Sequence, residues 1–95
     1  MNIDDRWQLH PQVALRPEPF GALLYHFGTR KLSFLKNPAI VDIVRSLPDH
    51  RDARAALIAA GITDNAMTRY VEALAALARS NMIVPAPNIA SEGSR

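Results

Sequence analysis

The side chains that could perform acid–base, nucleophilic or metal chemistry are few in this sequence and lie far apart. The histidines are His10, His26 and His50, and cysteine is absent. A metal site needs several convergent ligands, and the sequence has neither an HxxxH nor a paired-cysteine spacing that could supply them. We therefore expect no metal and no other cofactor.

Sequence motifs for phosphate binding and nucleophilic catalysis are also missing. The patterns GxxxxGK[ST], GxGxxG and GxSxG do not occur, so neither a phosphate loop nor a nucleophile elbow is predicted. Asp4 and Asp5 form an isolated acidic pair, which we expect to be solvated in a flexible terminus. Ser33 has no evident base to activate it. The sequence therefore predicts no catalytic residue, and a protein that binds rather than an enzyme.

A strand edge is the feature of this chain best suited to binding. Residues 16–47 predict three strands followed by a capped helix, and the last strand, within residues 30–36, contains neither Pro nor Gly. The preceding strand pairs with it across a turn at residues 27–30, which leaves its other side free. A free edge presents unpaired N–H and C=O groups on which another extended chain can add.

Alternating apolar and polar residues predict the three strands at 13–16, 22–27 and 31–35. Prolines on both sides of the first strand mark it as an edge that is protected against further pairing. A turn around Gly28 suits a hairpin between the second and third strands.

Three helices are predicted after the strands. Asn37 and Pro38 predict the start of the first, because Asn is a strong N-cap and Pro suits the first helical position, and Pro48 ends it. A second, alanine-rich helix covers about residues 52–60 and stops at Gly61.

A third helix is predicted over residues 64–80, with Thr63 or Asp64 as its cap and Asn81 at its end. We expect residues 82–84 to pack back onto the core. The elements together predict an α+β fold: a winged helix-turn-helix-like arrangement with a three-stranded antiparallel sheet followed by three helices. A simple two-layer packing of the helices on one sheet face is the alternative and has the same core.

We expect residues 1–85 to form a single peptide-recognition domain and residues 86–95 to form a flexible C-terminal tail. Trp7 and Phe20 flank the first strand, and both are expected to cap the core.

The N-terminus lacks the apolar stretch of a signal peptide, and no apolar run approaches the ~20 residues that span a bilayer. The predicted location is cytoplasmic, without membrane contact.

The net charge is only +2, but the excess lies entirely within residues 1–36. Arg30, Lys31 and Lys36 lie on or beside the last strand, which favours an acidic partner. The same charges could instead discourage edge-to-edge aggregation, and the two roles are compatible.

The third helix has an apolar arc that extends to one side. At ~100° per residue, Tyr70, Ala73 and Leu77 widen the buried stripe on that side, and Arg69 follows further round. Such a flank offers a surface for a ligand. Alternatively, Tyr70 and Leu77 cover another helix of the same domain.

The chain resembles the recognition-element family of peptide-binding chaperones, which includes the pyrroloquinoline quinone chaperone. The resemblance lies in the order of elements and in the segment VALRPEPFGALLYHFGTRKLSFLKNPAIVDIVRSL. Within that family the sequence is most similar to the chaperones of the mycofactocin pathway. The resemblance covers residues 7–84, and the text RYVEALAALARSNMIVPA fits the family's final helix.

The resemblance implies a non-catalytic adaptor that presents a short precursor peptide to a radical S-adenosylmethionine peptide-modifying enzyme. The charges beside the last strand predict that this precursor peptide is acidic. In this family the peptide adds as a strand to the third strand, beside the third helix. The peptide-binding residues predicted in this way are Arg30, Lys31, Leu32, Ser33, Phe34, Leu35, Lys36, Arg69, Tyr70, Ala73 and Leu77.

Two other functions compete with this one. A winged-helix nucleic-acid-binding protein would have a similar fold, but its recognition helix should present several cations to phosphates. The third helix carries Arg69 and Arg79 against Asp64 and Glu72 and has no Lys, so we expect no nucleic-acid partner. A small dimerisation module could use the same free strand to form a homodimer.

Overall fold

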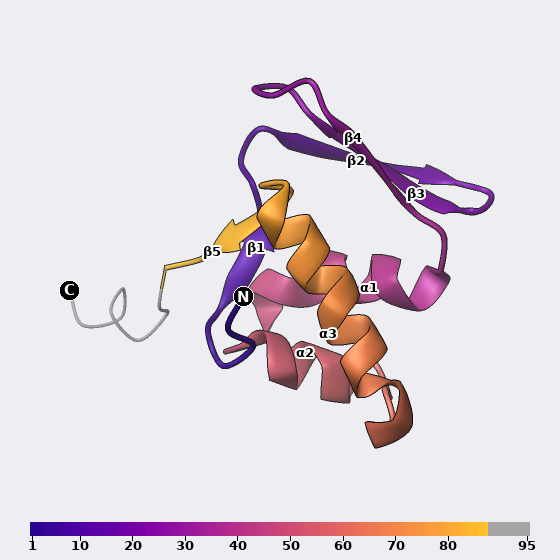
Figure 1. The fold of residues 1–95 in the computed structure, drawn as a ribbon, viewed down its shortest axis with the longest axis vertical. Coiled ribbons are helices and arrows are strands. Elements are labelled where there is room, and N and C mark those ends of the chain that lie inside the picture. Colours follow the sequence, from indigo (N-terminus) through magenta and orange to yellow (C-terminus); the bar gives the residue numbers. More distant parts are fainter. Residues whose placement is uncertain (88–95) are drawn as a thin grey trace.

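The computed structural model describes residues 1–87. Its elements follow one another in the order β1 (Trp7–Leu9), β2 (Val13–Glu18), β3 (Gly21–His26), β4 (Leu32–Leu35), α1 (Pro38–Ser46), the 3-10 turn η1 (Leu47–Asp49), α2 (Ala53–Ala59), α3 (Asp64–Arg79) and β5 (Ile83–Pro85). The expected α+β fold, with a three-stranded antiparallel sheet and then three helices, is confirmed (Figure 1).

Strands β2, β3 and β4 form one antiparallel sheet in that order, so β2 and β4 are its two edges. In β3 the even-numbered residues Ala22, Leu24 and His26 are buried, because successive side chains of a strand point to opposite faces. The helices lie on this inner side of the sheet (Figure 1). The sheet therefore has one packed face and one face without a covering layer.

The β3–β4 hairpin turns around Gly28, at residues 27–30, as the sequence predicted. Arg30, not Gly28, adopts the left-handed conformation, with φ 63°. Gly28 is needed for space instead, because a Cβ there would lie 2.5 Å from the Gln12 side-chain oxygen and 2.9 Å from a His26 ring carbon. The His26 Nδ1 atom also accepts the N–H groups of Gly28 and Thr29, which fixes the path of the turn.

The predicted helix ends are present. The Asn37 side chain accepts the N–H of Ala39 at 2.7 Å at the start of α1. Asn81, with φ 61°, ends α3 in a Schellman arrangement in which Met82 N–H donates to the Leu77 carbonyl. At the start of α3, Thr63 holds the cap position without a side-chain hydrogen bond.

A second, two-stranded sheet was not expected. β1 pairs antiparallel with β5, so the two ends of the described chain lie side by side. Met82 and Ile83 are buried, which confirms that this segment packs back onto the core.

Trp7 is buried as expected, but the expectation for Phe20 is wrong, since Phe20 is 42% exposed and lies outside the core.

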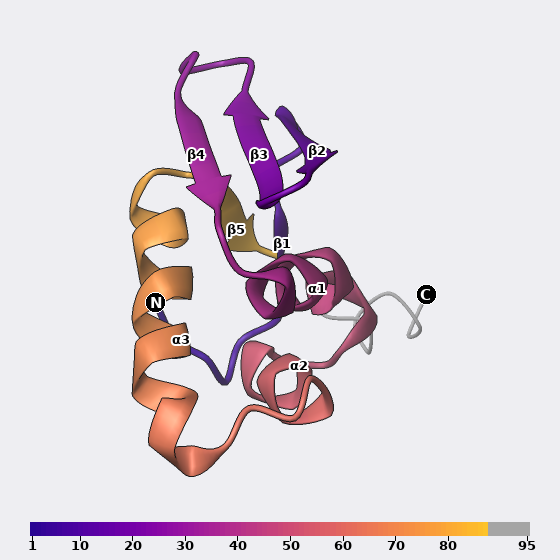
Figure 2. The same cartoon turned by 90° about the vertical axis from the view of Figure 1, so that its right-hand side faces the viewer.

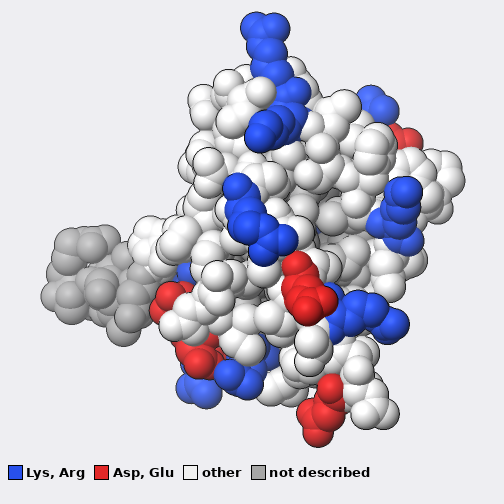
Figure 3. All heavy atoms as spheres, in the orientation of Figure 1, with Lys and Arg blue, Asp and Glu red and all other residues white. Residues whose placement is uncertain are grey.

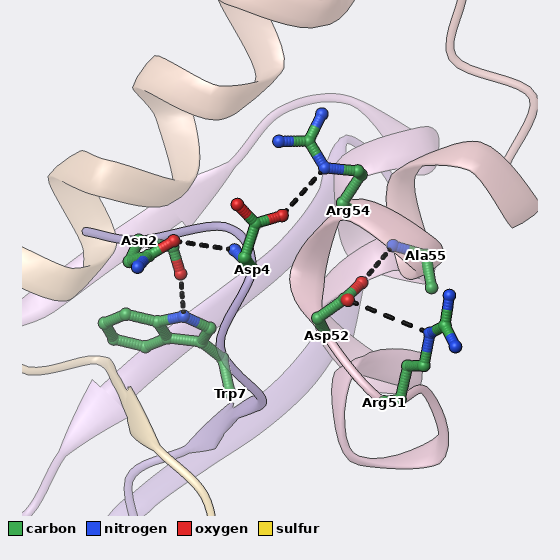
Figure 4. Close-up of polar contacts among 7 residues, drawn as sticks. All are labelled: Asn2, Asp4, Trp7, Arg51, Asp52, Arg54 and Ala55. Atoms are coloured by element: carbon green, nitrogen blue, oxygen red, sulfur yellow. Dashed lines mark hydrogen bonds and ion pairs between the residues drawn. The ribbon is translucent and has the colours of Figure 1, made fainter.

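The first residues are held against α2 and are not a free terminus (Figure 4). The carbonyls of Asp5 and Ile3 accept the N–H groups of Ala53 and Arg54, which have no partner within the helix at its N-terminus. The Asp4 carboxylate pairs with Arg54 at 2.9 Å, and this hydrogen bond lowers the pKa of Asp4.

The start of the expected C-terminal tail is also bound, since Ala86 N–H donates to the Arg6 carbonyl and the Arg6 side chain donates to the Pro87 carbonyl. Residues 88–95, the rest of that tail, lie outside the described residues. Within residues 1–87, no helix combines the length and the apolar character needed to cross a membrane.

Candidate functional site

A groove of about 540 Å³ lies between strand β4 and helix α3. Figure 2 shows these two elements on the same side of the molecule, with β4 at the edge of its sheet. The groove is lined by Leu32, Ser33, Phe34, Leu35, Lys36, Asn37, Ile40, Arg69, Tyr70, Ala73, Ala76, Leu77 and Ser80. One wall is therefore a strand edge and the other is the apolar flank of a helix.

The hydrogen bonds of the sheet determine which backbone groups of β4 are free. His26 N–H donates to the Lys31 carbonyl at 3.0 Å, and the next residues along, Tyr25 and Leu32, are opposite each other. Hydrogen-bonded and non-hydrogen-bonded pairs alternate in an antiparallel ladder. Ser33 and Leu35 therefore direct their N–H and C=O groups toward β3.

By the same alternation, Leu32 and Phe34 direct their N–H and C=O groups away from β3, along the free edge. These are the groups that a further strand could bind. The sequence alone did not show which residues of β4 faced outward, and the hydrogen bond between His26 and Lys31 supplies that information.

The opposite edge of the sheet is interrupted by a proline. Phe27 N–H donates to the Gln12 carbonyl at 2.8 Å, so the alternation leaves Pro17 and Ala22, which are opposite each other, as a non-hydrogen-bonded pair. The nitrogen of Pro17 therefore lies on the outer edge, where it has no N–H to offer.

One end of the groove carries most of its polar side chains. The Asn37 side-chain N–H donates to the Tyr70 hydroxyl oxygen at 2.9 Å, while the Asn37 oxygen caps α1. The Tyr70 hydroxyl can therefore still donate its own hydrogen. The Arg69 guanidinium lies over the Tyr70 ring, 5.8 Å from its centre.

The flank of α3 has the orientation that the sequence predicted. Tyr70, Ala73 and Leu77 all line the groove, and Leu77 is also buried against the core. Small residues continue along this wall at Ala76. The groove therefore has space beside Ala73 and Ala76 for the side chains of a ligand.

Nine of the eleven predicted site residues line this one groove. Arg30 and Lys31 do not, because they belong to the β3–β4 turn, where Arg30 N–H donates to the His26 carbonyl at 2.7 Å. Sequence reasoning missed Asn37, Ile40, Ala76 and Ser80 as lining residues. The helical spacing from Ala73 and Leu77 could have indicated Ala76 and Ser80.

The groove contains no carboxylate among its lining residues, whereas Lys36 and Arg69 supply two positive charges. In Figure 3 the upper, strand-bearing part of the surface carries mainly Lys and Arg, and most Asp and Glu side chains lie over the helices below. Among residues 1–87, no three His, Cys, Asp or Glu side chains come together to hold a metal ion. The arrangement suits binding of an extended, acidic segment.

Comparison with known proteins gives an independent result for the same part of the chain. A family model described as "Peptide chaperone MftB family" matches residues 6–84, which include β1 to β4, the three helices and the groove between β4 and α3. The chain belongs to the peptide chaperone MftB family. It is therefore a peptide chaperone of mycofactocin biosynthesis, and its family is non-catalytic.

Individual members of the family are also similar. The "Peptide chaperone MftB" of Mycolicibacterium smegmatis is 65% identical over 82 residues, which cover 86% of this chain and 80% of the relative. The proteins of the same name from Mycobacterium ulcerans and Mycobacterium tuberculosis are 63% and 61% identical, again over 86% of this chain and over 75% of each relative. No solved structure matches the chain.

Proposed function

We propose that this protein binds a precursor peptide by adding it as a fourth strand to the free edge of β4. The observation that carries the proposal is the pairing of that edge with an apolar groove, since the outward backbone groups of Leu32 and Phe34 lie beside the α3 flank. Backbone hydrogen bonds supply affinity in this mode, and pockets for alternate side chains supply specificity.

The groove favours a peptide with apolar residues at every second position. Alternate side chains of an added strand point to the same face, here toward Ile40, Ala73 and Leu77. Carboxylates of the peptide are placed near Lys36 and Arg69 at the polar end of the groove. The peptide is therefore acidic, with apolar residues spaced two apart.

The bound peptide is then presented to a radical S-adenosylmethionine enzyme, which modifies the part of the peptide that leaves the groove. The chaperone contributes no catalytic residue and needs no cofactor or metal for this role. It acts in the cytoplasm, without nucleic acid and without membrane contact. Residues 1–85 form the recognition domain.

Amide hydrogen exchange with a synthetic precursor peptide tests the strand addition directly. In the free protein the N–H groups of Ser33 and Leu35 should be protected by β3, and those of Leu32 and Phe34 should exchange fast. Peptide should protect Leu32 and Phe34 specifically. If peptide binds without changing the exchange of these two amides, it does not use the β4 edge.

Homodimer formation at the same edge is the competing function. It would protect the same two amides without peptide, in a manner that depends on protein concentration. Sedimentation velocity on the free protein separates the two cases, because a peptide-binding edge predicts a monomer whose amides become protected only after peptide is added.

A further inference from the structure

The outer face of the three-stranded sheet, which points away from the helices, is apolar over β3 and β4. Strand alternation places Leu23 and Tyr25 of β3 and Leu32 and Phe34 of β4 on this face. Figure 1 shows the helices on the other side of the sheet, and no described element covers the outer face.

Aromatic rings dominate this face. Of the six large hydrophobic side chains that are most exposed within residues 1–87, four lie here: Phe20 at 42%, Phe27 at 59%, Leu32 at 54% and Phe34 at 57%. Phe20 packs on Phe34 with ring centres 5.9 Å apart, and Phe27 packs on Tyr25 at 5.0 Å.

Such a face is unusual for a sheet in contact with water. The solvated face of an antiparallel sheet normally carries polar residues. Contiguous apolar patches on small proteins mark interaction sites. Only β2 follows the normal pattern, where Arg16 and Glu18 pair at 2.6 Å. The apolar part therefore lies on the side of the sheet next to the β4 edge.

Positive charge borders the apolar part. Residues 13–36 contain a single carboxylate, Glu18, and it is already paired with Arg16. Arg30, Lys31 and Lys36 have no ion-pair partner among the described residues. A hollow of about 340 Å³ combines both features, because two aromatic rings and a cation line it: Phe20, Phe34 and Lys36.

The outer face is continuous with the edge that the peptide occupies. A strand added to β4 would turn alternate side chains into the groove and the others onto the outer face, directly beside Leu32 and Phe34. A protein docked on this face would contact the chaperone and the bound peptide together.

We infer that the outer face is the docking surface for the folded enzyme that modifies the peptide, and that the enzyme meets it with an apolar patch bordered by carboxylates. The inference rests on the proposed function and adds a second, separate interface to it. A second copy of this chain fits the face less well, because two such faces in contact would set Arg30, Lys31 and Lys36 against the same cations, and residues 13–36 offer no unpaired carboxylate between them.

The test uses two exposed rings that do not line the peptide groove. A Phe20→Ser, Phe27→Ser double variant removes apolar surface from the outer face, and Ile58→Ser on α2 is the matched control, because Ile58 is 61% exposed on a different surface. Binding of the synthetic precursor peptide and binding of the purified radical S-adenosylmethionine enzyme of the pathway are measured separately, by calorimetry and by surface plasmon resonance.

The double variant should keep the peptide affinity of the wild type and lose about tenfold or more in affinity for the enzyme, as expected when central aromatic contacts are removed. Ile58→Ser should change neither. Unchanged enzyme affinity in the double variant overturns the inference but leaves the proposed function intact. Absence of peptide binding by the wild type would instead refute the proposed function.

Sedimentation velocity tests the other occupant. The wild-type chain should remain a monomer at micromolar concentrations, with or without the two serines. A wild-type dimer that the double variant converts to monomer would show that a second copy covers the face, and the inference would then be wrong.

Discussion

Strands β2 and β4 form the two edges of one sheet and share the same central strand, β3. The β2 edge has Pro17 where an outward N–H would otherwise be, and its outer face carries the Arg16–Glu18 ion pair. The β4 edge has outward N–H groups at Leu32 and Phe34 and no proline. The same sheet thus has one edge closed to further strands and one edge open to them.

The neighbouring elements differ as well. Helix α3 lies beside β4 and leaves a groove lined by Ala73, Ala76 and Leu77, whereas β2 has no helix beside it at its free edge (Figure 2). An exposed edge alone invites non-specific pairing. An edge next to a shaped apolar groove selects chains by their side chains as well as by their backbone.

The largest expected effect comes from making the β4 edge resemble the β2 edge. A Leu32→Pro substitution removes an outward N–H and leaves the ladder with β3 intact. We expect the variant to fold normally and to lose measurable binding of the precursor peptide, as followed by calorimetry and circular dichroism.

Ser33→Pro is the matched control, one residue further along the same strand. Its N–H faces β3, so its loss leaves a ladder acceptor unpaired and should lower the free energy of unfolding by about 1–3 kcal/mol. If both variants fold and bind peptide normally, the ligand does not use β4, and the difference between the two edges has no functional meaning.

The next largest effect should come from filling the groove. An Ala73→Leu substitution adds side-chain volume where the peptide's apolar residues are proposed to lie, and overpacking of this kind costs about 1–3 kcal/mol. Peptide affinity should fall by a corresponding amount while the melting temperature stays close to that of the wild type. Thr68→Leu, on the same helix but away from the groove, should have no effect on affinity; equal losses in both variants would contradict a groove-bound peptide.

Local sequence signals were sufficient for much of this site. Asn37 and Pro38 predicted the start of α1, and the angular positions of Tyr70, Ala73 and Leu77 predicted the groove wall. These features depend on residues a few positions apart, where capping chemistry and the helical period act directly.

Other features depended on contacts between distant residues, which the sequence did not reveal. β1 and β5 are three residues long each, too short for a period to be evident, and they pair across nearly the whole described chain. The Asn37–Tyr70 hydrogen bond joins residues 33 positions apart. Phe20 was expected in the core because aromatic residues usually lie there, but its ring packs on Phe34 on the outer face.

A smaller effect is expected from charge at the open edge. Lys36→Gln should weaken binding of an acidic peptide by about 0.2–1 kcal/mol, the usual value of an exposed ion pair. Raising the salt concentration should weaken wild-type binding moderately and should affect the variant less. Arg45→Gln, which removes an exposed cation from α1, is the control. Affinity that does not respond to salt would leave the edge and the groove as the only sources of binding.

The smallest effect is expected from opening the closed edge. A Pro17→Val substitution restores an N–H that points away from β3 and leaves the existing ladder unchanged, because Pro17 and Ala22 are a non-hydrogen-bonded pair. Weak self-association through β2 should appear at high protein concentration in sedimentation velocity, with the peptide affinity of β4 unaltered.

Ala14→Val is the control for this last variant, since it adds apolar surface to β2 while its N–H remains directed toward β3. It should stay monomeric. If both variants associate equally, the added apolar surface causes the association, and the N–H restored at position 17 does not. If neither associates even at high concentration, Pro17 is not what closes the β2 edge, and the specificity of β4 must come from the groove beside it.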